Sequence, residues 1–150
     1  MTKRREFIKK SILGTAGITI GGMGFSAKSY ESIVAANDRL FLAVIGIRGQ
    51  GGSHIESWCE LTENRNIRLK TICDVDEQYY AEKSKIIFDK TGIKPVTEWD
   101  MRKVFDDKEI NAVSFAVPNH WHALGTIWAC QAGKHVYVEK PLTHTIYESR

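Results

Sequence analysis

"FLAVIGIRGQGGSHI", residues 41–55, joins an apolar run to a glycine-rich turn. The run over residues 40–45 is typical of a fully buried parallel strand, and the residues after the turn have helical spacing. Free N–H groups at the N-terminus of a helix bind phosphate, and glycines let the backbone come close to it. The usual dinucleotide-binding turn is G-x-G-x-x-G, and Arg48 stands at its second glycine. The turn alone therefore allows two interpretations, a phosphate site and an ordinary tight turn.

The positions of this turn have separate structural roles. We expect Gly46 to form the tight exit from the strand and Gly51 to lie where the helix packs on the strand. Arg48 takes the position of closest backbone approach. Its side chain is tolerable if it points away from a phosphate or lies over it as a counter-charge. It could also reach a 2′-phosphate and so favour NADP.

Strand-like and helix-like segments alternate after this turn. The expected strands cover residues 40–45, 67–73, a short segment around 96, 110–118 and 135–139, and the expected helices cover residues 53–62, 76–90, a segment capped by Asp100, 119–132 and a start at Thr145. This order predicts an α/β fold, a Rossmann-type doubly wound parallel sheet with helices on both faces. Because such domains have about six strands, we expect residues 37–150 to be an NAD(P)-binding Rossmann domain that is incomplete at its C-terminal end.

Residues 1–36 have the three parts of a secretory leader: the charged start "TKRREFIKK", the Gly/Ala/Ile-rich stretch "SILGTAGITIGGMGFSA" and the small residues of "VAAN". The apolar stretch is too short and too rich in glycine for a stable membrane span, although an uncleaved N-terminal anchor is an alternative. Arg4-Arg5, followed by "EFIK", resembles the twin-arginine signal, with Lys3 at the usual Ser/Thr position. We expect export in the folded state to the periplasm or another envelope compartment.

The composition excludes several classes of function. The formal net charge is +3 over 150 residues, but residues 1–36 hold six basic and two acidic side chains, so the remainder is close to neutral. A basic groove for nucleic acid therefore has no support. Cys59, Cys73 and Cys130 have no C-x-x-C spacing, which argues against a disulfide framework and a zinc knuckle. We expect all three to be small buried residues.

Asp74 strengthens the nucleotide interpretation. It ends the second predicted strand, 28 residues after Gly46, where this fold places an acidic residue that accepts hydrogen bonds from the adenosine ribose. A carboxylate there also repels a 2′-phosphate, so NAD is favoured over NADP. The alternative is that Asp74 and Asp76 only cap a helix.

Two later stretches complete a family pattern. With the turn and Asp74, "FAVPNHWHALG" (115–125) and "AGKHVYVEKPLTHT" (132–145) resemble the Gfo/Idh/MocA family over about residues 40–150. The resemblance implies a Rossmann domain followed by an α/β substrate domain, and NAD(P)-dependent oxidation or reduction of sugars, polyols and related compounds. Glu139-Lys140-Pro141 is its most specific part. In the family's G-x-G-G-x-G turn, Gly46, Gly49 and Gly51 match and Arg48 replaces the middle glycine.

Lys140 is the catalytic candidate. On a strand end beside a proline, its ammonium group could hydrogen-bond a reacting hydroxyl, stabilise a developing alkoxide and relay a proton. The resemblance gives this lysine a catalytic or substrate-positioning role and places Glu139 beside the nicotinamide. A lone lysine would otherwise be interpreted as a solvated surface residue.

Asn119, His120 and His122 follow a predicted strand end and belong to the ligand-binding rim. The resemblance places His122 near the cofactor. The H-x-H spacing also occurs in zinc sites, but further ligands are missing nearby, so no metal is predicted. The predicted cofactor-binding residues are Gly46, Ile47, Arg48, Gly49, Gly51, Asp74, Pro118, Asn119, His122, Glu139 and Lys140.

Three functions remain open. The first is an exported NAD-dependent oxidoreductase that transfers a hydride between a sugar-like alcohol and nicotinamide. The second is an NAD-dependent glycosidase of the same family that oxidises its substrate transiently; Glu139-Lys140-Pro141 favours the first. The third is a nucleotide-binding fragment that is inactive alone, because the family's further catalytic Asp and His, and any homo-oligomer contacts of the missing domain, would lie beyond Arg150.

Overall fold

The computed structural model describes residues 39–149, and the predicted export signal, residues 1–36, lies outside the described residues. The five strands are β1 (Leu40–Ile45), β2 (Ile67–Cys73), β3 (Val96–Glu98), β4 (Ala112–Phe115) and β5 (His135–Val138). The four α-helices are α3 (Gln50–Arg65), α4 (Tyr80–Thr91), α5 (Met101–Asp106) and α6 (His122–Gln131). Short 3₁₀ helices are η1 (Glu77–Tyr79), η2 (Asn119–Trp121) and η3 (Tyr147–Ser149).

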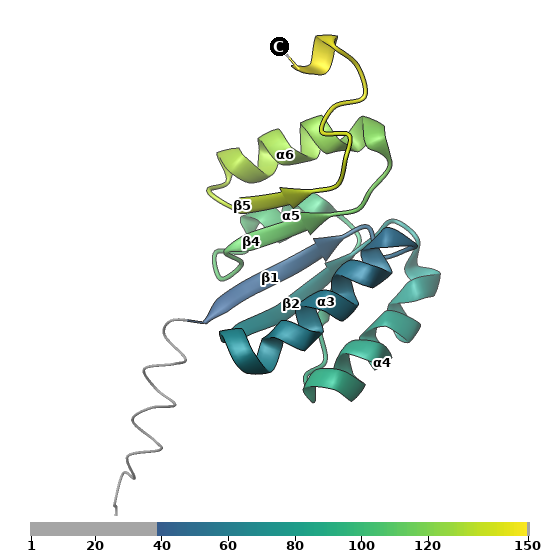
Figure 1. Cartoon of the computed structure of the whole chain (residues 1–150), viewed down its shortest axis with the longest axis vertical. Helices are drawn as coiled ribbons and strands as arrows, with labels where there is room; N and C mark the ends of the chain where they lie inside the picture. Colours follow the sequence, from purple (N-terminus) through teal and green to yellow (C-terminus); the bar gives the residue numbers. More distant parts are fainter. Residues whose placement is uncertain (1–38, 150) are drawn as a thin grey trace, which may run out of the picture. The chain divides into compact units, whose positions relative to one another are not determined.

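The strands form one parallel sheet in the order β3-β2-β1-β4-β5 (Figure 1). The chain first winds outward from β1 through β2 to β3, then returns to the other side of β1 for β4 and β5. This order confirms the predicted Rossmann-type fold. Because the winding reverses between β1 and β4, the loops after these two strands diverge and leave a crevice at the carboxyl edge of the sheet.

Two apolar layers hold the sheet between its helices. One layer lies between the sheet and helices α5 and α6, and its residues are Ala43, Ile45, Cys73, Val104, Phe105, Ile110, Val113, Phe115 and Ala129. Those of the other layer, which involve α3 and α4, are Leu42, Val44, Ile47, Ile55, Cys59, Leu69, Ile72 and Ile87. Alternate residues of β1 belong to opposite layers, so this strand is buried on both faces, as its continuous apolar sequence predicts.

Local signals set most element ends. The Asp76 side chain accepts a hydrogen bond from the Gln78 N–H at the start of η1, and Asp100 accepts one from the Arg102 N–H at the start of α5. Gly92 ends α4 in a left-handed conformation with φ of 69°. These three predicted ends are confirmed.

Some predicted bounds differ from the structure. The strand expected over residues 110–118 is limited to Ala112–Phe115, because the chain turns away from β1 before Pro118. The helix expected from Ser53 begins three residues earlier, directly at the glycine turn. Cys59 and Cys73 are buried as predicted, but the prediction was wrong for Cys130, which is exposed on α6.

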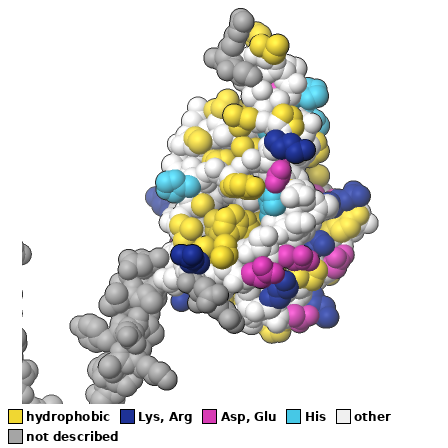
Figure 2. Space-filling view, in the orientation of Figure 1, with side chains coloured by type: hydrophobic (Ala, Val, Ile, Leu, Met, Phe, Trp, Pro, Cys, Tyr) yellow, Lys and Arg dark blue, Asp and Glu magenta, His cyan; other side chains and the backbone are white. Residues whose placement is uncertain are grey.

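The face of the molecule shown in Figure 2 carries different side chains over its two halves. On the face shown in Figure 2, acidic side chains gather over α3 and α4, whereas several hydrophobic side chains lie exposed toward β4 and β5. Tyr137 of β5 is 54% exposed and Ile127 of α6 is 49% exposed. Within residues 39–149, no helix has the length and hydropathy that crossing a membrane requires.

Candidate functional site

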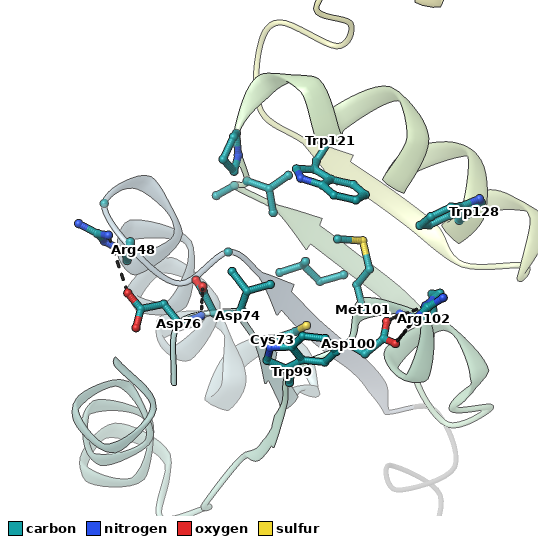
Figure 3. A pocket seen from close by; sticks show the side chains of 17 residues that line it. Arg48, Cys73, Asp74, Asp76, Trp99, Asp100, Met101, Arg102, Trp121 and Trp128 are labelled. Atoms are coloured by element: carbon teal, nitrogen blue, oxygen red, sulfur yellow. Dashed lines mark hydrogen bonds and ion pairs between the residues drawn. The ribbon is translucent and has the colours of Figure 1, made fainter. Parts of the chain in front are cut away.

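A cavity of about 970 Å³ opens at the carboxyl edge of the sheet, where the crevice was expected (Figure 3). It lies between the loops that follow β1, β2, β3 and β4. Its lining residues are Ile45, Gly46, Arg48, Gly49, Cys73, Asp74, Val75, Asp76, Trp99, Asp100, Met101, Arg102, Ala116, Val117, Pro118, Trp121 and Trp128. A volume of this size lies in the range of cofactor sites.

The glycine turn packs without room for side chains at two positions. Gly46 has φ of 81°, and a Cβ there would lie 2.5 Å from the carbonyl oxygen of Ala116. A Cβ on Gly51, in the first turn of α3, would lie 1.8 Å from the carbonyl oxygen of Gly46. Both positions therefore require glycine, and α3 begins directly against the end of β1.

The N-terminus of α3 is suited to an anion. Gly49 precedes the helix with φ of 45°, and the space where its Cβ would lie is open to a distance of 4 Å. Within the first turn of α3 there is no acidic side chain, whereas α5 begins with the capping carboxylate of Asp100. No side chain caps this helix N-terminus, so the turn fits the pyrophosphate of a dinucleotide. A carboxylate from another element, that of Glu139, comes close to this turn, with its Oε1 3.5 Å from Nε2 of Gln50.

Arg48 extends sideways from this turn toward η1 (Figure 3). Its guanidinium carbon lies 4.9 Å from the ring centroid of Tyr79, and its Nη1 lies 4.0 Å from Oδ2 of Asp76. The side chain is 64% exposed. Of the two arrangements expected for Arg48, the structure has the one in which the side chain points away from the phosphate position. The turn therefore presents only backbone groups there.

Asp74 links the end of β2 to the glycine turn. Its Oδ2 accepts a hydrogen bond of 2.9 Å from the N–H of Ile47, and its Oδ1 accepts one of 3.0 Å from the N–H of Asp76. Ile47 thus contributes through its backbone, while its side chain is buried in the core. Each carboxylate oxygen keeps a further lone pair for a ribose hydroxyl. Capping of η1 is the role of Asp76, not of Asp74.

Aromatic and sulfur-containing side chains on the far wall were not predicted as site residues. Trp99 and Met101 follow β3 at the edge of the sheet, and Trp121 and Trp128 face them from η2 and α6 (Figure 3). The two tryptophan rings from η2 and α6 are 6.5 Å apart. An apolar wall of this kind suits a planar base such as adenine. Trp128 also packs against the core.

A buried histidine joins α3 to the ends of β4 and β5. His54 Nδ1 lies 2.8 Å from Oγ of Ser114, and its Nε2 lies 2.9 Å from Oε1 of Glu139. Because a carboxylate only accepts, Nε2 donates to Glu139, while Nδ1 pairs with the serine hydroxyl. The hydrogen bond from His54 holds the pKa of Glu139 below its usual range, against the opposing effect of burial. Glu139 is thereby fixed toward α3.

His122 connects two loops of the rim. The side chain is 1% exposed, with Nδ1 2.6 Å from the carbonyl oxygen of Pro141 and Nε2 2.9 Å from that of Val117. Carbonyl oxygens only accept hydrogen bonds, so the ring is positioned as a donor between the loops after β4 and after β5. Its predicted contact with a cofactor stays a prediction.

The other predicted residues lie along the same edge. Pro118 lines the cavity, and Asn119 begins η2 as an exposed residue. The N–H of Glu139 donates to the carbonyl oxygen of Phe115, which aligns the end of β5 with that of β4. Lys140 follows with an exposed side chain. Lys140, Glu139, Asn119 and His122 do not line the cavity itself; they lie on the segments that follow β4 and β5.

Residues 39–149 contain no group of three or more His, Cys, Asp or Glu side chains arranged to hold a metal ion.

Comparison with known proteins agrees with this geometry. The family described as "Oxidoreductase family, NAD-binding Rossmann fold" (GFO_IDH_MocA) matches residues 40–150. A glycosyl hydrolase family 109 protein of Shewanella sp. (strain MR-4) is 28% identical over 162 residues, which cover 97% of this chain and 35% of that protein. An α-N-acetylgalactosaminidase of Shewanella oneidensis is 27% identical with the same coverage.

Among solved structures, levoglucosan dehydrogenase in complex with NADH is 30% identical with a TM-score of 0.64, over 75% of this chain and 30% of that protein. The chain thus spans about a third of the length of the relatives it matches. The family binds NAD, and the close packing of the glycine turn agrees with a dinucleotide site, so NAD is the cofactor of this domain. The chain belongs to the Gfo/Idh/MocA family of NAD-binding oxidoreductases with a Rossmann fold.

Proposed function

We propose that this protein is an oxidoreductase that transfers a hydride between a sugar, a polyol or a similar alcohol and NAD. The observation that carries the proposal is Glu139-Lys140-Pro141 at the carboxyl end of β5, held to α3 through His54. Levoglucosan dehydrogenase, with the same fold and 30% identity, supports the class of substrate.

The chemistry is divided between cofactor and protein. When bound, NAD supplies the nicotinamide that accepts or donates the hydride. The α3 N-terminus and the glycine turn hold the pyrophosphate, and Asp74 accepts hydrogen bonds from the ribose. The Lys140 ammonium donates a hydrogen bond to the oxygen of the reacting hydroxyl and stabilises the alkoxide that develops there as the hydroxyl proton passes to solvent.

His54 and Glu139 support this arrangement. The ring of His54 joins Ser114 of β4 to Glu139, which directly follows β5, so the residue before Lys140 is fixed relative to the first turn of α3. A catalytic group held in this way loses little orientational freedom when the substrate binds.

A second candidate function is favoured by the Shewanella relatives, which are named as glycosidases. In this alternative the protein oxidises a sugar hydroxyl transiently, eliminates the aglycone and reduces the product while keeping NAD bound. The same turn, Asp74 and Lys140 would serve the hydride transfer, but no net NADH would form.

One assay distinguishes the two functions. The protein is incubated with NAD and a panel of sugars and polyols while absorbance of NADH is followed, and in parallel with nitrophenyl glycosides while nitrophenol release is followed. Sustained NADH formation with a free sugar supports the dehydrogenase. Glycoside cleavage without net NADH would replace it by the glycosidase.

The role of Lys140 has its own test. Lys140→Met is expected to lower the turnover rate by about 100-fold or more with NAD affinity nearly unchanged, because the ammonium group acts on the reacting hydroxyl. Lys108→Met, which removes an exposed lysine outside the cavity lining, is the control and should leave turnover unchanged. Equal turnover in both variants would contradict the catalytic role.

We also propose export through the twin-arginine route, with residues 1–36 as the signal and the Rossmann domain starting at about residue 37. The family match beginning at residue 40 supports this boundary. Replacing both Arg4 and Arg5 with lysine should retain the protein in the cytoplasmic fraction, and unchanged export would contradict the proposal.

A further inference from the structure

We propose that the carboxylate of Asp76 strengthens the preference of this protein for NAD over NADP, because it adds negative charge beside the expected position of a 2′-phosphate and compensates the charge of Arg48. The inference goes beyond the proposed oxidoreductase function, because it concerns the binding of the cofactor and is independent of the substrate.

Three charged side chains meet at the edge of the cavity beside β2. Asp74 and Asp76 both line the cavity, and so does Arg48, which comes from the turn after β1 (Figure 3). The Asp76 carboxylate is 4.0 Å from Arg48, and its Oδ2 accepts a 2.5 Å hydrogen bond from Nε2 of Gln78. The net charge of these three side chains is therefore negative.

This balance opposes a 2′-phosphate. The ribose hydroxyls are expected at Asp74, and a phosphate on one of them would add up to about two negative charges next to both carboxylates. Among the described residues, the cationic side chains that line the cavity are Arg48 and Arg102. Arg102 is paired with Asp100. The Arg48 guanidinium is already shared between Asp76 and the ring of Tyr79. NAD lacks this phosphate and meets no such repulsion.

Arg48 is nevertheless able to bind a phosphate. Its side chain is 64% exposed, and it is held by one ion pair at 4.0 Å and one cation–π contact at 4.9 Å. Exposed contacts of this kind contribute little free energy, so the guanidinium can move to a nearer anion. Guanidinium and phosphate form strong bidentate pairs. Without the charge of Asp76, Arg48 becomes a phosphate ligand, and one source of repulsion is removed.

The test is calorimetric titration of the full chain with NAD⁺ and with NADP⁺. Asp76→Asn is expected to raise the affinity for NADP⁺ relative to NAD⁺ by about tenfold, as expected for one unit charge about 6 Å from a phosphate at an exposed site. Asp76→Ser keeps a capping side chain for η1 and should give the same shift, which separates lost charge from a lost cap. Asp76→Asn combined with Arg48→Gln should lose most of the gain.

Glu77→Gln is the matched control, because it removes the same charge one residue along the chain and outside the cavity lining. It should leave the affinity ratio unchanged. The proposal is overturned if Asp76→Asn and Asp76→Ser leave the ratio as in the wild type, or if Glu77→Gln changes it equally. A full gain in the Arg48→Gln double variant would overturn the part given to Arg48. Failure of the wild type to bind either nucleotide would contradict cofactor binding itself, whereas failure to oxidise sugars would contradict the proposed function alone.

Discussion

Two adjacent glycines in the first turn of α3 lead to opposite predictions for the same substitution. A Cβ on Gly51 would lie 1.8 Å from the carbonyl oxygen and 2.7 Å from the carbonyl carbon of Gly46. A Cβ on Gly52 would meet its nearest neighbour, Nζ of Lys83, at 3.5 Å, an ordinary van der Waals distance. Gly51→Ala therefore forces α3 away from the end of β1, whereas Gly52→Ala fits without movement.

The magnitudes follow from these distances. Replacing glycine by alanine inside a helix stabilises it by about 0.5–1 kcal/mol, and Gly52→Ala should show this gain in full. Gly51→Ala has the same gain, but the contact must lengthen by well over 1 Å, and overpacking against backbone costs about 1–3 kcal/mol or more. We expect a net loss of about 2 kcal/mol. For a domain of this size the midpoint of thermal unfolding should fall by roughly 8 °C for Gly51→Ala and rise by roughly 3 °C for Gly52→Ala.

Thermal and urea unfolding followed by circular dichroism measures both effects, and calorimetric titration with NAD⁺ measures the effect on the site. Gly51→Ala should also weaken NAD binding, because the shifted turn no longer presents its N–H groups to the pyrophosphate. If Gly51→Ala is as stable as Gly52→Ala, the close packing of α3 on the turn is refuted.

Further predictions concern cysteines, a tyrosine and a carboxylate. Iodoacetamide at pH 8 should label only Cys130 in the folded protein, because burial raises the pKa of Cys59 and raises that of Cys73 to about 12. Mass spectrometry of digests should find all three cysteines labelled only when the protein is denatured. Early labelling of Cys73 would contradict the structure. Tyr80→Phe should lower the free energy of unfolding by about 1 kcal/mol, because its hydroxyl lies 2.5 Å and 2.6 Å from the carbonyl oxygens that follow β2 and end β3; an unchanged urea midpoint would count against this link. The pKa of Glu139 is lowered in the folded state, so the ionised carboxylate stabilises the fold above the ordinary glutamate pKa, and this stabilisation is lost as pH falls through the lowered value. The difference in free energy of unfolding between wild type and Glu139→Gln should therefore shrink in that acidic range. A difference that grows there would contradict the stabilising role of the ionised carboxylate.

The parts of the fold that depend on local sequence were predictable. β1 and β2 have the bounds expected from their apolar runs, because strands buried on both faces leave a continuous hydrophobic sequence that ends abruptly at Gly46 and at Asp74. The ends at Asp76, Asp100 and Gly92 were predictable for a similar reason, since capping is a property of one residue and its next neighbours.

Other parts of the site depend on contacts between distant residues. His54 and Glu139 are 85 residues apart, and nothing in the spacing of either residue indicates that they meet. Trp99 and Met101 lie at the start of a helix that the sequence predicted, but their place in the cavity wall depends on where β3 lies at the edge of the sheet. The direction of Arg48 depends on where η1 places its partners, so the sequence could state the alternatives but could not choose between them.

The most direct test of the account is fluorescence titration of the full chain with NADH, exciting tryptophan. Three of the four tryptophans, Trp99, Trp121 and Trp128, line the cavity that we assign to the cofactor. The account predicts saturable quenching of tryptophan emission with a matching rise in NADH emission, and competition by NAD⁺. Tryptophan emission that stays unchanged, or that falls without saturation, would contradict cofactor binding in this cavity.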